Sequence, residues 1–202
     1  GREQNAHDQG SHDGNIGNGA GKMREDMKAQ IADAFSRILE KEDIDKITVT
    51  RLIEECHVSR QTFYYHFHDI MDVLEWTFKR STQILVQKSL ESEDRMAALK
   101  EFSSFVRMNR RKLKKLVESK RWFQIEGMMV DAVKVYLEKM AQSEMSDLRI
   151  GYEDMQVMLM FYACGMVGVL FQNIDEKQVD EERLLRQIER IITGKMFPGK
   201  QE

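Results

Sequence analysis

Side chains that can bind nucleic acid are concentrated between Thr48 and Phe67 of this 202-residue chain. Three of the five histidines lie in this stretch or directly after it, as do two adjacent tyrosines and the pair Arg60-Gln61. Arginine can donate two hydrogen bonds to the edge of a guanine, and glutamine can bridge an adenine. The stretch therefore has the chemistry to recognise base edges in a DNA major groove, if the fold presents these side chains together.

The spacing of apolar residues predicts a helix-turn-helix that would do so. Thr48 and Ser59 are suitable N-caps for its two helices, and Asp69 for the helix that follows, because each side chain can accept a hydrogen bond from a free backbone N–H. The turn between the helices is Cys56-His57-Val58. The residues expected to pack inside are Val49, Leu52, Ile53, Val58, Phe63 and Phe67. The second helix would then expose Arg60, Gln61, Tyr64, Tyr65 and His66.

Other groups in this stretch suit the phosphate backbone of DNA. Thr48, Thr62, Tyr65 and His66 can donate hydrogen bonds to phosphate oxygens, which positions a protein on the duplex without reading its sequence. The first helix of the pair also begins with free backbone N–H groups, and these attract anions. The stretch thus supplies both kinds of contact that sequence-specific DNA binding needs.

The sequence ITVTRLIEECHVSRQTFYYHF resembles the N-terminal domain of the TetR family of bacterial transcriptional repressors. The longer run QTFYYHFHDIMDVLEW is similar to the branch related to regulators of dihydroxyacetone kinase operons. The resemblance covers residues 24–80, and beyond them only the helix pattern and the run FYACGMVGVLFQNI match. It implies an all-α fold with an N-terminal three-helix DNA-binding domain and a C-terminal helical domain that binds an effector and dimerises.

The resemblance also implies roles for individual residues. The DNA-binding set comprises Thr48, Thr50, Arg51, Arg60, Gln61, Thr62, Tyr64, Tyr65 and His66; of these, Thr50, Arg60, Gln61 and Tyr64 fall where the family reads bases. Two positions depart from the family pattern. His57 stands where the turn usually has glycine, and Ile70 stands where a phosphate-contacting lysine is common.

The rest of the chain is predicted to be helical as well. Apolar residues recur every three to four positions, and only one proline is present. We expect about nine helices, divided into three parts. Residues 1–22 are predicted to be a disordered tail or a remnant of expression, residues 23–68 the helix-turn-helix domain, and residues 69–202 the effector-binding and dimerisation domain.

The charge of the chain limits how it can bind DNA. The net charge is −3, and residues 24–68 contain seven Lys/Arg and nine Asp/Glu. No overall positive field draws the protein to nucleic acid, so binding must come from a local surface. The segment 107–121 is the exception, with eight basic residues and one acid. It is either a solvated helix face or a surface for an anionic ligand or partner.

Several other classes of protein are disfavoured. Cys56, His57, His66 and His68 match no common zinc spacing, and no arrangement for catalysis or nucleotide binding occurs, so we expect no metal, no cofactor and no enzyme. The two cysteines are predicted to be reduced core thiols of a cytoplasmic protein. No apolar run approaches the 18 or more residues of a membrane span, so we expect no membrane contact.

The second half of the chain is rich in methionine and aromatic residues. Ordinary core packing is one interpretation, and a flexible effector pocket is the other. The effector would be a small molecule or a protein. The pocket residues would be Trp122, Phe123, Met129, Tyr136, Phe161 and Tyr162.

The last two helices are too apolar for one small domain to bury. Two such helices from each of two subunits would form a four-helix interface. Its residues are predicted to be Phe161, Gly165, Met166, Val169, Leu185, Ile188 and Ile192. The two reading helices of the homodimer would lie about 34–36 Å apart, one turn of DNA, which implies a palindromic operator.

The leading hypothesis is therefore a homodimeric regulator, expected to be a repressor, that binds double-stranded DNA. The alternative is a helical interaction protein that keeps the fold but regulates through another protein. The missing lysine at Ile70, the acidic N-terminal domain and the basic segment 107–121 leave this alternative open.

Overall fold

The computed structural model describes residues 16–144, 151–174 and 181–192. Within these ranges the chain forms nine α-helices, one short 3-10 helix and no strand, which confirms the predicted all-α fold. The elements are α1 (Ile16–Lys41), η1 (Ile44–Lys46), α2 (Val49–Cys56), α3 (Arg60–His66), α4 (Ile70–Leu90), α5 (Arg95–Met108), α6 (Arg110–Val117), α7 (Trp122–Glu144), α8 (Tyr152–Asn173) and α9 (Glu181–Ile192).

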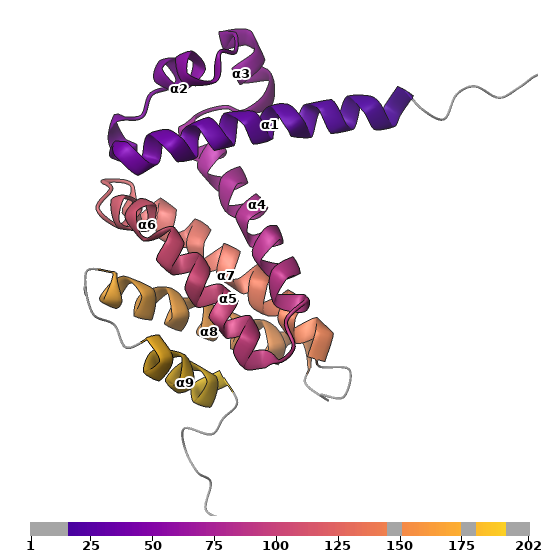
Figure 1. Ribbon diagram of the computed structural model, residues 1–202, viewed down its shortest axis with the longest axis vertical. Coiled ribbons are helices and arrows are strands. Elements are labelled where there is room, and N and C mark those ends of the chain that lie inside the picture. The colour runs from indigo at the N-terminus through magenta and orange to yellow at the C-terminus, as the bar shows by residue number, and fades with distance from the viewer. Residues whose placement is uncertain (1–15, 145–150, 175–180, 193–202) are drawn as a thin grey trace, which may run out of the picture.

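Helices α1 to α3 form the N-terminal domain at the top of Figure 1, where α2 and α3 lie above the long α1. The predicted caps are confirmed. The Thr48 side chain accepts a hydrogen bond from the Arg51 N–H, and the Ser59 side chain accepts one from the Thr62 N–H. Such caps satisfy backbone donors that the first helical turn leaves unpaired. They set where these two short helices begin.

Helix α1 begins earlier than predicted. Residues 1–22 were predicted to be a tail, whereas α1 starts at Ile16 and so extends into that segment. Residues 1–15 lie outside the described residues. Packing of Ile31, Phe35 and Ile38 in the core holds the later turns, and helix propagation from an existing turn is much easier than nucleation.

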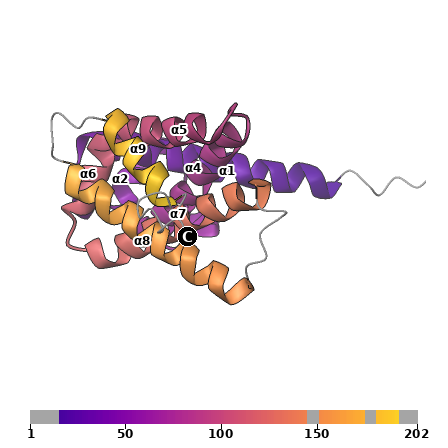
Figure 2. The same cartoon turned by 90° about the horizontal axis from the view of Figure 1, so that it is seen from below.

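Helix α4 joins the N-terminal domain to the bundle of α5 to α9 (Figures 1 and 2). Asp69 caps it as predicted, by accepting a hydrogen bond from the Asp72 N–H. Ile70, which replaces a family lysine, is buried with Met71 and Leu74 in a core that continues from one domain into the other. The departure at Ile70 therefore adds packing at the junction rather than a phosphate contact.

Polar contacts also join the two domains. The Asp45 carboxylate in η1 accepts hydrogen bonds from the Ser119 hydroxyl at 2.8 Å and the Lys120 N–H at 2.9 Å. Lys112 of α6 pairs with Glu40 of α1 at 3.2 Å. Part of the basic segment 107–121 thus holds the domains together, a role that neither of our two interpretations of it included.

Helix α8 differs from the prediction about apolar runs. Among the described residues it is the one helix long and apolar enough to cross a membrane, by length and composition alone, with a mean hydropathy of 1.6. Core helices of soluble proteins pass the same test, so this is weak evidence for a membrane. Only 22% of its apolar window is buried within the protomer. Helix α8 therefore carries an apolar face that the protomer leaves uncovered.

Candidate nucleic-acid interface

The helix pair α2 and α3 is built on a few fully buried side chains. Leu52, Phe63 and Phe67 are at most 2% exposed, and the Phe63 and Phe67 rings lie 6.1 Å apart. The turn between the helices passes through His57, whose φ of 55° is left-handed as expected for the glycine position it occupies. Histidine is tolerated in this region better than bulky or branched residues are.

The opposite face of α3 presents the predicted reading residues. Arg60 and Gln61 are exposed, and Tyr64 and Tyr65 are 48% and 65% exposed. The Arg60 guanidinium donates a hydrogen bond to the Thr50 hydroxyl at 2.9 Å, so two predicted base-reading residues are joined across the turn. This contact restricts the arginine before any DNA is bound, which lowers the entropy cost of using it.

The predicted phosphate-binding groups lie at two edges of this face. Thr48 is exposed beside the free N–H groups at the start of α2, while Thr62 is half-buried and shares a 2.7 Å hydrogen bond with Ser59. Arg51 is placed differently, because its guanidinium is 3.7 Å from Glu42 and 3.4 Å from Glu55. Those pairs neutralise much of the charge that Arg51 was expected to offer to DNA.

Two basic residues of α1 that we did not predict lie beside α3. The Arg24 guanidinium lies 4.9 Å from the centre of the Tyr65 ring, and the Lys28 ammonium lies 5.7 Å from that of Phe67. Their four-residue spacing on one helix face was visible in the sequence, but its proximity to α3 depends on how α1 packs. They add positive charge beside the exposed row.

The acids of the N-terminal domain are largely engaged elsewhere. Asp33 pairs with Arg80 of α4 at 2.7 Å, Glu40 pairs with Lys112, and Asp45 accepts hydrogen bonds from the turn before α7. Asp43 pairs with Lys46, and this neighbour holds the pKa of Asp43 below its usual value. Three of the nine acids of the domain, Asp33, Glu40 and Asp45, therefore contact the C-terminal domain.

His66 ends α3 in a position that disfavours its charged form. Its Nδ1 atom is buried and has no hydrogen-bond partner among the residues that the structure describes. Burial lowers the pKa of His66, and the positive charges of Arg24 and Lys28 lower it further. At neutral pH the imidazole is therefore uncharged and can donate one hydrogen bond to a phosphate through its other nitrogen.

This shift in pKa makes stability depend on pH in a defined direction. The unfolded chain takes up the His66 proton near pH 6.5, but the folded chain does so only at lower pH. Stability should therefore fall as the pH drops below about 6.5 and level off once the folded pKa is passed. Thermal melts between pH 7.5 and 5 should show a smaller fall for His66→Asn, while His68→Asn, an exposed neighbour, should match the parent. Equal slopes for both variants would contradict this assignment.

The residues predicted to line an effector pocket do not come together. Met129 and Tyr136 line an internal cavity of about 60 Å³, where the Tyr136 hydroxyl donates a 3.1 Å hydrogen bond to Ser89. Phe123 and Phe161 are instead 89% and 71% exposed. Trp122 packs edge-on against Phe171, and Tyr162 is half-buried beside Phe161. Adjacent helical residues point about 100° apart, so neighbours of core residues face solvent.

The predicted dimer residues also divide into two groups. Met166 and Leu185 are only 6% and 7% exposed within the protomer, so they are core residues rather than free interface residues. Met166 lies on α8, which packs against α7, and Leu185 lies on α9, which packs against α5. Phe161 and Gly165 are exposed, and Val169, Ile188 and Ile192 are half-buried.

The cysteines are placed differently from one another. Cys56 is buried as predicted, and its thiol donates a 2.9 Å hydrogen bond to the Leu52 carbonyl. Burial raises the pKa of this thiol, which keeps it protonated and unsuited to metal binding. Cys164 is exposed, so its assignment to the core was wrong. Among the described residues no three His, Cys, Asp or Glu side chains are grouped to hold a metal.

Comparisons with known proteins agree with this architecture. No protein-family model matches the chain, and no curated protein matches it by sequence. Solved structures do match. One, titled dihydroxyacetone kinase operon activator DhaS, is 18% identical, with a TM-score of 0.61 over 84% of this chain and 95% of that chain.

Two further solved structures have the same fold. A TetR-family transcriptional regulator from Streptomyces coelicolor is 11% identical, with a TM-score of 0.59 over 83% of this chain and 81% of that one. The TetR family repressor AlkX from Dietzia sp. is 16% identical, with a TM-score of 0.54 over 83% and 94%. The chain therefore has the fold of TetR-family regulators.

Proposed function

We propose that this chain is a DNA-binding transcriptional regulator that recognises a palindromic operator as a homodimer and represses transcription from it. The observation that carries the proposal is the exposed row of Arg60, Gln61, Tyr64 and Tyr65 on a short helix whose other face is buried. A helix-turn-helix presents its second helix to the major groove in this way. The fold shared with solved regulators supports the same function.

The dimer is supported by the uncovered apolar face of α8. Val157 and Phe161 lie one turn apart on this helix and are 70% and 71% exposed. A Cβ added at Gly165 or Gly168 would meet no atom within 4 Å, so this face is open to close approach by another helix. An uncovered apolar helix face commonly marks a protein interface. A second copy of the chain would cover both apolar faces across a two-fold axis.

An effector bound in the C-terminal domain would control the spacing of the two reading helices. Helix α4 is the element that would transmit the change, because it is continuous from the N-terminal domain into the bundle. An effector shifts this equilibrium only if it binds the two spacings with different affinity. Such a regulator would act in the cytoplasm, where its DNA is.

Selection of bound DNA from a random pool tests the proposal. The chain should enrich a palindrome whose half-sites lie one helical turn apart. Arg60→Ala should weaken binding to that sequence by about 5- to 150-fold, which corresponds to the loss of one bidentate base contact. Arg111→Ala, which removes an exposed arginine from α6, should leave the affinity nearly unchanged.

The result could contradict the proposal in a clear way. If no sequence is enriched even at low salt, where phosphate contacts are strongest, the chain is not a DNA reader. Capture of a specific protein partner by the same preparation would then favour the interaction-protein alternative. A reporter placed behind the enriched sequence gives the direction of regulation, since similar structures are titled both activator and repressor.

A further inference from the structure

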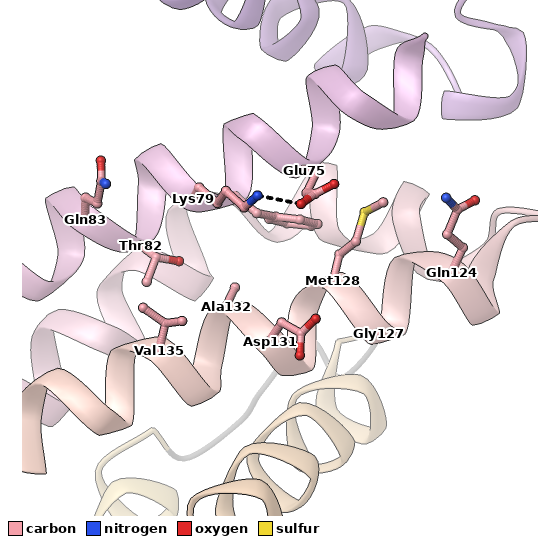
Figure 3. Close-up of a pocket in the computed structure, with 11 residues that line it drawn as sticks. Glu75, Lys79, Thr82, Gln83, Gln124, Gly127, Met128, Asp131, Ala132 and Val135 are labelled. Atoms are coloured by element: carbon pink, nitrogen blue, oxygen red, sulfur yellow. Dashed lines mark hydrogen bonds and ion pairs between the residues drawn. The ribbon is translucent and has the colours of Figure 1, made fainter. Parts of the chain in front are cut away.

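A groove runs between α4 and α7 on the surface of the C-terminal domain (Figure 3). It consists of two adjoining hollows of about 480 and 470 Å³, which share Thr82, Gln83 and Val135. Its apolar lining comes from Phe78, Leu90, Met128, Ala132 and Val135. Each hollow alone has the size of a small-molecule site, about 300–1,000 Å³, whereas the internal cavity beside Tyr136 does not.

Among the described residues, one threonine hydroxyl on the wall of this groove has no hydrogen-bond partner. Thr82 is 8% exposed and projects from α4 toward α7, and within the described part of the chain its hydroxyl makes no hydrogen bond. Thr77, on the same helix, instead donates to the Val73 carbonyl at 2.7 Å. The Thr82 hydroxyl is not sealed off from solvent, so it is available to hydrogen-bond a molecule that enters the groove.

The charges that line the groove define what kind of molecule this is. Lys79 is paired with Glu75, whereas the Asp131 carboxylate has no partner among the described residues. These three groups sum to −1 at one end of the groove. The other end carries one acid and one base, Glu91 and Lys139. The unbalanced charge at Asp131 is therefore negative, and it lies next to apolar surface.

We propose that the groove between α4 and α7 binds an organic cation with an apolar chain, such as an alkylammonium. The cationic head lies at Asp131, which accepts its hydrogen bonds, and the chain lies along Ala132 and Val135 toward Thr82. A charged hydrogen bond to a carboxylate is stronger than a neutral one, which favours a cation over an alcohol of the same length.

The position of the groove gives such a ligand a way to act on α4. Phe78, Thr82 and Ala132 line both the groove and the internal cavity, so they form a single wall between the two. A molecule bound between α4 and α7 would change the angle at which α4 packs against the bundle. As an effector site the groove depends on the proposed function, but as a binding site it does not.

Binding of octylammonium, octanol and octanoate to the purified chain without DNA tests the proposal by calorimetry. These probes share a chain length and differ in the charge of the head group. Octylammonium should bind at least about tenfold more tightly than octanoate. Asp131→Asn should weaken octylammonium by about tenfold and leave octanol unchanged, whereas Glu153→Gln, an equal loss of charge at the exposed start of α8, should have no effect.

Val135→Trp provides the second variant. Val135 is 45% exposed on the groove wall, so a larger side chain there fills the groove without entering the core. It should abolish octylammonium binding while thermal melting stays cooperative. Retained binding in this variant, equal binding of octanoate, or no binding of any probe would each overturn the proposal. A change in the oligomeric mass of the Val135→Trp variant would also overturn the proposal, because the groove would then be an interface between copies of the chain.

Discussion

Phe161→Glu is expected to convert the proposed dimer into monomers and to lower affinity for the proposed operator by about 10²- to 10⁴-fold. The Phe161 ring is 71% exposed on the apolar face of α8, so the substitution leaves the protomer core unchanged. In the proposed dimer it would bury one negative charge from each subunit in the interface, which disfavours association strongly. Loss of the second reading helix removes the gain from simultaneous binding to two half-sites.

Phe123→Glu is the matched control for this prediction. Phe123 is 89% exposed on α7, so the same change is made at an aromatic residue outside the proposed interface. Light scattering should give a dimer mass for the control and a monomer mass for Phe161→Glu. In gel retardation the control should bind the operator like the parent, and Phe161→Glu should bind it more weakly. A dimer that survives Phe161→Glu with unchanged affinity would place the interface elsewhere.

Phe63→Ala is expected to destabilise the N-terminal domain by about 3–5 kcal/mol, because removing a buried ring leaves a cavity that neighbours only partly fill. Phe63 has no exposed surface and contacts Phe67 and Tyr64 from the centre of the helix pair. A seven-residue helix is not stable alone, so α3 depends on this packing. Urea unfolding followed by circular dichroism measures the loss, and DNA retention should disappear with it.

Gln61→Ala separates reading from folding. Gln61 is exposed two positions before Phe63, and surface substitutions usually change stability by no more than about 0.5 kcal/mol. This variant should unfold at the parent urea concentration but bind the selected operator more weakly. If Phe63→Ala bound DNA normally, or if Gln61→Ala destabilised the domain as much, the division of α3 into a packing face and a reading face would be wrong.

Local features of the N-terminal domain were largely predictable from the sequence. Thr48, Ser59 and Asp69 cap their helices as expected, because a cap depends on a side chain and backbone groups two or three residues away. The left-handed His57 and the buried Phe63 follow from the same short-range pattern. The base-reading and phosphate-binding roles assigned to the exposed residues remain predictions.

Contacts between distant segments were not predictable in this way. Arg24 lies beside Tyr65, and two acids of the N-terminal domain, Asp33 and Glu40, pair with Arg80 and Lys112. These contacts depend on the angles at which the helices cross. Composition alone suggested that the charge of the N-terminal domain opposes DNA binding. The tertiary structure places three of the nine acids, Asp33, Glu40 and Asp45, against the C-terminal domain.

In the C-terminal domain the sequence by itself determined that helices form, but not which neighbours cover them. Phe123 and Phe161 looked like pocket residues because they are aromatic, yet both face solvent, while Met166 is covered within the protomer. Hydrophobic periodicity shows which face of a helix is apolar. It does not show which element packs on that face, because the hydrophobic effect is non-directional. Only the packing of α4 against α7 decided that Asp131 and Thr82, 49 positions apart, line one groove.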